Sequence, residues 1–281
     1  MDLFNSGILQ SGDWRRHLAF PAAVNLVKNF VPKHSELQFL EVGVWAGFST
    51  ASWIKALKNS GRKFHITVID SWQPGYSDQD FERSDHYIRM TELTKNGEIE
   101  AIFRANMKKL LLDEQITILK GNSLELLKSL PNNFFHLISV DANHLYEYVL
   151  ADLNEAERIL HPDGVIVGDD LEAQFDEIEF ISTEKAEYVQ DYESGMSYHP
   201  GVTRAVWEKY GRVSSFLGLF MVDKNGFAPK GLSYPTNFSV RLARKPSSSL
   251  YMYLRLLPIV KELVDLLHVQ RIKVRLKSLK R

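Results

Sequence analysis

Acidic residues and glycines recur directly after short apolar runs of this chain. Glu41 and Gly43 close the run QFLEVGV, Gly47 lies four residues further on, and Asp70 closes the run HITVID. An acidic side chain about twenty residues beyond a glycine turn can accept both hydroxyls of a ribose. A carboxylate just before the first glycine favours a cationic amino group over a phosphate. These residues therefore indicate a site for a nucleoside that carries an amino acid.

Three further carboxylates follow two later apolar runs. Asp141 lies near the end of HLISVDA, and Asp169 and Asp170 end GVIVGDD. Carboxylates gathered at neighbouring strand ends repel one another unless a cation lies between them, and hard divalent cations prefer oxygen ligands. The pattern predicts a Mg²⁺ site on these three aspartates. The alternative is that some of them cap helices or bind loop amides.

A histidine lies three residues beyond the first of these aspartates. Near neutral pH an imidazole can accept the proton of a hydroxyl group, so we predict His144 as a general base, with Asp141 beside it in the catalytic site. Tyr146 and Tyr148 flank the same predicted helix start. The alternative is a histidine that only satisfies a turn.

Apolar runs alternate with segments of helical periodicity, which predicts an α/β fold. Strands are expected at 38–44, 65–70, 116–121, 136–142, 164–170, 216–222 and 238–243. Helices are expected at 14–30, with an interruption at Pro21, and at 49–58, 99–112, 146–160 and 201–210. Intervening helices imply parallel strands, and a reversal at 223–226 makes the final pair antiparallel. We predict a Rossmann-like, seven-stranded, mostly parallel sheet with the last strand antiparallel, flanked by helices, and ligands at the carboxyl ends of its strands.

The composition excludes several functional classes. The 281 residues carry 34 Lys and Arg against 35 Asp and Glu, and this balance predicts no nucleic-acid partner. The absence of cysteine excludes disulfides, thiolate nucleophiles and Cys-ligated metals. The start lacks the basic flank and apolar core of a secretory signal, and no run of 18 apolar residues occurs, so we expect a cytoplasmic protein.

Three regions are expected along the chain: a helical cover over 1–37, the main domain over 38–245, and a basic amphipathic helix over 246–281. Within the main domain, 71–114 is too long for a simple connection and is predicted as an insertion that covers the site. The C-terminal helix has three alternatives: packing on its own domain, packing in a homodimer, or contact with an anionic membrane surface. A polar stretch is predicted as a solvated face, and it carries Asp176, Glu177, Glu179, Glu184 and Glu187.

Several motifs together resemble the class I S-adenosylmethionine-dependent methyltransferases, in particular the group that includes macrolide-sugar O-methyltransferases and cephalosporin-hydroxylase-like proteins. The motifs are EVGVWAGFST (41–50), SVDANHLYEYVLADL (139–153), and GVIVGDD followed by HPGVTRAVWE (199–208), and the resemblance covers about 39–222. It implies that Gly43 and Gly47 shape the loop under the methionine part of S-adenosylmethionine, that Glu41 lies near its amino group, and that Asp70 holds the ribose. Ser123 would lie beside the adenine, with Trp72 as an apolar wall.

The resemblance also implies a reaction, which is divalent-cation-assisted methylation of a hydroxyl on a small molecule or sugar. His144 stands where some relatives carry lysine, and Asn143 stands where they carry aspartate, which is a departure from their pattern. Arg204 either holds a substrate anion or only pairs at the surface, and we favour the second reading. Two other functions stay open: an NAD(P)-dependent oxidoreductase, disfavoured because G-x-G-x-x-G is absent, and a non-catalytic S-adenosylmethionine-binding partner in glycan or natural-product biosynthesis.

Overall fold

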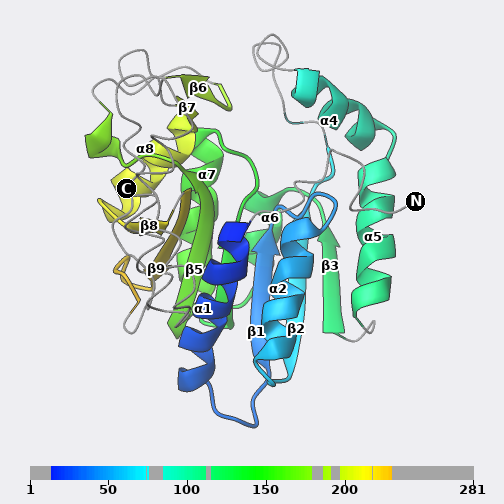
Figure 1. The fold of residues 1–281 in the computed structure, drawn as a ribbon, viewed down its shortest axis with the longest axis vertical. Coiled ribbons are helices and arrows are strands. Elements are labelled where there is room, and N and C mark those ends of the chain that lie inside the picture. Colours follow the sequence, from blue (N-terminus) through cyan, green and yellow to red (C-terminus); the bar gives the residue numbers. More distant parts are fainter. Residues whose placement is uncertain are drawn as a thin grey trace, which may run out of the picture.

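A seven-stranded sheet runs through the middle of the molecule, with helices on both of its faces (Figure 1). The computed structural model describes residues 14–73, 75, 85–111, 115–178, 186–190, 197–216 and 218–229. Within these residues the strand order is β3-β2-β1-β4-β5-β9-β8. None of the described helices is long and apolar enough to cross a lipid bilayer.

The strands of the large sheet are β1 (Leu37–Val42), β2 (Phe64–Asp70), β3 (Ile116–Lys120), β4 (Phe135–Val140), β5 (Leu160–Leu171), β8 (Ser214–Phe216) and β9 (Gly218–Asp223). The short strands β6 (Val189–Gln190) and β7 (Ser197–Tyr198) form a second, two-stranded sheet. The helices are α1 (Trp14–Phe30), α2 (Phe48–Asn59), α4 (Asp85–Lys95), α5 (Glu98–Leu110), α6 (Ser123–Ser129), α7 (Tyr146–Ile159) and α8 (Pro200–Tyr210), with a 3₁₀ turn, η2, at Phe175–Glu177.

The strand directions confirm the predicted fold class. Strands β3, β2, β1, β4 and β5 are parallel, whereas β9 runs antiparallel to β5 and β8 runs antiparallel to β9. The strand predicted at 238–243 and the helix predicted at 246–281 lie outside the described residues. The seventh described strand is β8, which the sequence analysis did not predict because three residues are too few to show a periodicity.

Both faces of the sheet are buried, which explains the uninterrupted apolar runs. Along β1, Leu37 and Phe39 belong to the core under α1, α2 and α5, whereas Leu40 and Val42 belong to the core under α7 and α8. Neighbouring residues of a strand point to opposite faces, so a strand between two helical layers has no polar side.

The N-terminal helix α1 is continuous, and the predicted interruption at Pro21 is wrong. A proline inside a helix removes one hydrogen bond and costs about 3 kcal/mol. Packing against the sheet opposes this cost, because the neighbouring Ala19, Ala23 and Val24 are almost completely buried. Phe20 also stacks on Trp53 of α2, with ring centroids 3.6 Å apart and an interplanar angle of 6°.

The ends of β1 and β4 approach so closely that only glycine fits between them. Gly43 has a φ of +82°, and a Cβ added there would lie 2.0 Å from the carbonyl oxygen of Asp141. Gly61 has a similar φ of +70° but open space around the position of a Cβ. The two positions therefore share the same backbone conformation and differ in steric room.

The substitution Gly43→Ala is expected to lower the free energy of unfolding by at least about 3 kcal/mol, because backbone must move as well as adopt a strained conformation. Urea unfolding measures this change. Gly61→Ala is the matched control, with an expected loss of about 1 kcal/mol from backbone conformation alone. Equal losses in the two variants would contradict the close approach of β1 and β4.

Candidate active site

A cavity of about 890 Å³ lies at the carboxyl ends of β1, β2, β4 and β5. Its lining includes the following residues predicted from the sequence: Gly43, Asp70, Trp72, Ser123, Asp141, His144, Asp169 and Asp170. Met90 and Thr94 of α4 also line it, so part of the segment predicted as an insertion borders the site. Glu41 and Gly47 do not belong to the lining.

Asp70 holds together the loops that follow β1 and β2. Its Oδ2 accepts the backbone N–H groups of Val44 at 2.8 Å and Trp45 at 2.9 Å, and its Oδ1 accepts that of Trp72 at 2.7 Å. Trp45 and Trp72 both have positive φ angles, 48° and 46°. Burial raises the pKa of Asp70, although the three N–H groups oppose this effect. The carboxylate thus fixes two strained loop residues at the edge of the cavity.

Gly47 serves helix packing. It precedes the first residue of α2 with a φ of +90°, and a Cβ there would lie 2.9 Å from side-chain atoms of Phe103 and Met107 on α5. The glycine therefore allows α5 to lie against the start of α2. The sequence analysis assigned Gly47 to the loop under the ligand and did not predict this packing role.

Glu41 is completely buried behind the loop that follows β1. Burial raises its pKa to about 7, while the neighbouring Ser49, Thr50 and Arg16 lower it in part. Neither carboxylate oxygen has a hydrogen-bond partner of standard geometry among the described residues. Because Glu41 does not line the cavity, its predicted contact with a ligand amino group would have to act through the loop.

The raised pKa of Glu41 predicts a stability that falls as pH rises. Between about pH 4.5 and 7 the folded protein keeps the proton that the unfolded chain has lost, so rising pH favours unfolding. Glu41→Gln has no proton to lose there. Its free energy of unfolding relative to wild type is expected to increase by roughly 2 to 3 kcal/mol from pH 5 to pH 8.

Urea unfolding of the ligand-free protein at several pH values measures this change. Glu125→Gln on the exposed side of α6 is the control, and its difference from wild type is expected to stay constant with pH. A pH-independent difference for Glu41→Gln as well would contradict a neutral, buried Glu41.

Two arginines from the start of α1 neutralise two of the three predicted metal ligands. Arg15 Nη1 lies 3.2 Å from Asp169 Oδ1, and Arg16 Nη2 lies 3.3 Å from Asp169 Oδ2 and 3.5 Å from Asp141 Oδ2. Burial raises the pKa of Asp169 despite both arginines. Burial would also raise that of Asp141, but His144 and Arg16 outweigh it and lower the pKa. Guanidinium groups thus supply the positive charge that the sequence analysis assigned to Mg²⁺.

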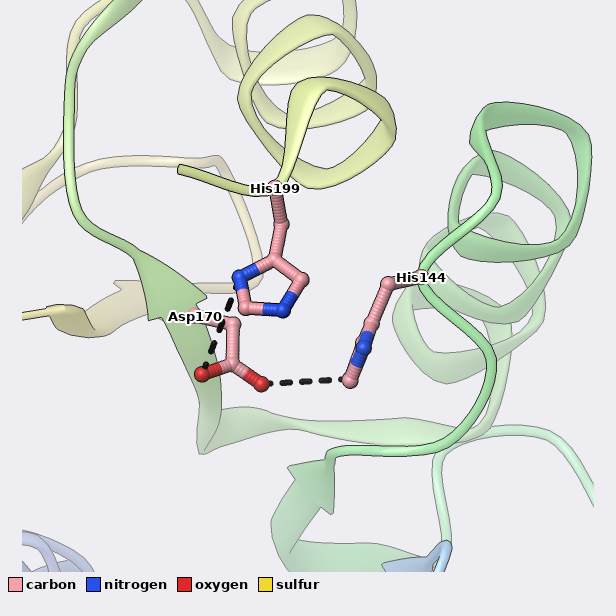
Figure 2. A group of neighbouring side chains, drawn as sticks. All are labelled: His144, Asp170 and His199. Carbon is pink, nitrogen blue, oxygen red and sulfur yellow. Dashed lines mark ion pairs between the residues drawn. The ribbon is translucent and has the colours of Figure 1, made fainter. Parts of the chain in front are cut away.

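The third predicted ligand, Asp170, faces two histidines (Figure 2). His144 Nε2 lies 3.1 Å from Asp170 Oδ2 and 3.5 Å from Asp141 Oδ1, and His144 Nδ1 lies 2.5 Å from Glu187 Oε1. Burial opposes a charge on His144, but Glu187 and Asp170 outweigh this effect and raise its pKa well above 6.5. These carboxylates therefore favour the protonated form of His144.

His199, at the N-cap of α8, completes this group. Its Nδ1 lies 2.9 Å from Glu172 Oε1 and 4.0 Å from Asp170 Oδ1, and its ring centroid lies 4.7 Å from that of His144. Asp170 has a φ of 61°, which is the left-handed backbone conformation that residues other than glycine rarely adopt. Burial and repulsion from Asp169 raise the pKa of Asp170 to about 7. We refer to His144, Asp170, Glu172, Glu187 and His199 as the acid–histidine cluster.

The polar stretch predicted as a solvated face is divided between surface and site. Glu187 is only 6% exposed and contacts His144, so its assignment to the solvated face is wrong. Asp176 and Glu177 pair with Arg212. Glu179 and Glu184 lie outside the described residues.

The sequence analysis also missed Arg15, Arg16 and Glu172 as members of the site. Their side chains show no motif: the placement of α1 brings Arg16 to the cavity and Arg15 to Asp169, and the segment after β5 brings Glu172 to His199. Arg204, by contrast, lies over the ring of Tyr146, with Cζ 4.0 Å from the ring centroid, which agrees with the non-functional reading.

Comparison with known protein families decides the class of this site. Residues 40–171 match the sequence model of a family described as a methyltransferase domain. The match confirms the resemblance to S-adenosylmethionine-dependent methyltransferases over this segment. The segment begins in β1 and ends in β5, so the match contains the loops that carry Gly43, Asp70, Asp141 and His144. The methyltransferase domain thus includes most of the cavity.

The solved structures that match this chain include methyltransferases. The O-methyltransferase NovP is 21% identical, with 75% of this chain and 80% of that chain covered and a TM-score of 0.47. The methyltransferase PaMTH1 of Podospora anserina, solved with bound S-adenosylhomocysteine, is 19% identical, with 79% and 88% covered and a TM-score of 0.44. No curated protein sequence matches the chain. At these identities and TM-scores, the roles of individual residues rest on the geometry of this chain alone.

Proposed function

We propose that this methyltransferase transfers the methyl group of S-adenosylmethionine to a hydroxyl oxygen of a small molecule or sugar. The observation that supports this proposal is a single cavity with two chemically different ends. The donor end carries the Gly43 turn, Asp70, Trp72 and Ser123, and the acceptor end carries Asp141, His144, Asp170 and Glu187. Donor and acceptor held in one enclosed space can align in line, which is the main requirement of methyl transfer.

The whole cavity, about 890 Å³, lies in the range of pockets that hold a cofactor-sized ligand. Its donor end also fits S-adenosylmethionine in polarity. Asp70 lies where it can accept ribose hydroxyls, while Trp72 offers an apolar wall and Ser123 a hydroxyl. When bound, S-adenosylmethionine supplies a methyl group on a positively charged sulfur, which is a good leaving group.

The acceptor end can take the proton that the substrate hydroxyl loses. His144 lies between the carboxylates of Glu187 and Asp170, so a proton delivered to any of the three is shared among them. Asp170, whose pKa is raised to about 7, can accept a proton near neutral pH, whereas the carboxylates around His144 raise its pKa and favour its protonated form. We therefore propose that this linked group, and not the imidazole of His144 alone, accepts the proton.

The predicted magnesium site does not fit these residues. Mg²⁺ requires near-octahedral oxygen ligands, but Asp169 pairs with Arg15 and Arg16, and Asp141 pairs with Arg16. A metal cation between these carboxylates would lie beside two guanidinium groups, which would repel it. The proposed reaction therefore includes no step through Mg²⁺.

Two measurements test the proposal in sequence. Calorimetric titration is expected to show binding of S-adenosylhomocysteine and none of NAD⁺. Incubation with S-adenosylmethionine labelled in its methyl group, over a panel of phenols, polyols and sugars, is then expected to give a labelled methyl ether. Binding of NAD⁺ in place of S-adenosylhomocysteine, or transfer of label only to nitrogen or carbon acceptors, would contradict the proposal.

A further inference from the structure

We propose that His144, Asp170 and His199 bind one divalent transition-metal ion, such as Zn²⁺ or Fe²⁺. The proposal deepens the proposed function, on which it rests, by placing an ion at the acceptor end of the cavity. The ligand set consists of two imidazoles and one carboxylate, and it shares only Asp170 with the magnesium site predicted from the sequence.

The three ligand atoms already form a compact group. All of them lie within 4.8 Å of one another, and they are the one such group of His, Asp or Glu side chains among the described residues. Atoms that share an ion at about 2.1 Å lie up to about 4.2 Å apart, so a small inward movement of the side chains completes the site. Figure 2 shows the two rings and the carboxylate turned toward one another, from the loop before α7, the end of β5 and the start of α8.

Both imidazoles are oriented as metal-ligating histidines usually are. Glu187 lies 2.5 Å from Nδ1 of His144, and Glu172 lies 2.9 Å from Nδ1 of His199. A carboxylate on one ring nitrogen fixes the ring and leaves the other nitrogen for the metal. The Nε2 atom of His144 is buried and has no hydrogen-bond partner of good geometry in the described part of the chain. His144 thus offers Nε2 to the ion, whereas His199 faces Asp170 with Nδ1, at 4.0 Å, the nitrogen that also contacts Glu172.

The distribution of charge favours this position over the predicted one. Arg15 and Arg16 pair with Asp169 and Asp141. The carboxylate of Asp170 instead faces the two histidines. The choice of metal follows from the donor atoms, because imidazole nitrogen suits zinc and iron, whereas Mg²⁺ prefers oxygen.

One side of the ion would be open to the substrate. His144 and Asp170 line the cavity, whereas His199 does not. Two imidazoles and one carboxylate on one side of a metal leave coordination positions free on the other. A substrate hydroxyl bound there would have a lowered pKa, and its proton would pass to a carboxylate of the cavity that is not a metal ligand.

The test is a metal titration of chelator-treated protein by calorimetry, with Co²⁺ absorption in the visible range as a second readout. We expect one Co²⁺ or Zn²⁺ per chain, bound at least 100-fold more tightly than Mg²⁺. His199→Ala and Asp170→Asn are each expected to weaken Co²⁺ binding at least 100-fold. His161→Ala is the matched control and is expected to leave it unchanged, because His161 belongs to a separate histidine pair with His136.

Three results would overturn the inference: no stoichiometric binding of Co²⁺ or Zn²⁺, wild-type binding by both site variants, or Mg²⁺ binding that Asp169→Asn abolishes and His199→Ala does not. Titration of the same samples with S-adenosylhomocysteine separates the two proposals and reports on folding. If S-adenosylhomocysteine binds and the metals do not, only the metal site fails. If the metals bind and S-adenosylhomocysteine does not, the proposed function fails.

Discussion

The substitution Asp70→Ala is expected to weaken the binding of S-adenosylhomocysteine by about 100-fold. Three backbone N–H groups, from Val44, Trp45 and Trp72, lose their acceptor in this variant. A lost partner costs on the order of 1 kcal/mol for each group, and 100-fold in affinity corresponds to about 2.7 kcal/mol. The loops around the cavity would no longer be held in their strained conformation, and the ribose would lose an acceptor. Calorimetric titration measures the dissociation constant.

Two further variants make this result specific. Asp163→Ala removes an exposed carboxylate at the opposite edge of the sheet and is expected to leave the affinity unchanged. Asp70→Asn keeps one carbonyl oxygen that can still accept some of the three N–H groups. Its affinity for S-adenosylhomocysteine is therefore expected to lie between those of wild type and Asp70→Ala. An unchanged affinity in Asp70→Ala would show that the donor binds elsewhere.

The substitution His144→Gln is expected to lower the rate of methyl transfer by about 1000-fold. His144 contacts both Glu187 and Asp170, so its loss removes the link between the carboxylates at the acceptor end. It also removes one of the two imidazoles of the proposed metal site. The affinity for S-adenosylhomocysteine is expected to change less than twofold, because the contacts of Asp70 stay intact. Single-turnover measurements with the acceptor found in the hydroxyl panel give the rate.

The comparison between the two substitutions is as informative as either alone. Asp70→Ala acts on donor affinity, whereas His144→Gln acts on the rate at saturating donor. His161→Gln is the control for loss of a histidine and is expected to keep both quantities at wild-type values. A His144→Gln variant with the wild-type rate would remove the acid–histidine cluster from the reaction.

Some disagreements with the sequence analysis have local causes. The interruption at Pro21 was expected because a proline removes a helix hydrogen bond, but packing against α2 and the sheet holds α1 continuous. The strand β8 was missed because a segment of three residues has no measurable periodicity. In the first case tertiary contacts override a local preference, and in the second the sequence carries too short a signal.

The sequence by itself determined the central sheet and the residues at the ends of its strands. Apolar runs separated by helices imply parallel strands, and parallel strands bring their carboxyl ends to one edge. For this reason Gly43, Asp70, Asp141, His144 and Asp170 could be placed around one site from their positions in the chain alone. Their types also indicated a nucleoside at one end and proton or cation chemistry at the other.

Only the tertiary structure decided which charges meet at the acceptor end. Arg16 pairs with Asp169 across 153 residues of sequence, and His144 pairs with Glu187 across 43. Contacts of this kind depend on how α1 and the segment after β5 pack against the sheet, and no periodicity or motif records that packing. Long-range packing therefore set the partner of each carboxylate, and with it the choice between a magnesium site on three aspartates and a site built from two histidines and one aspartate.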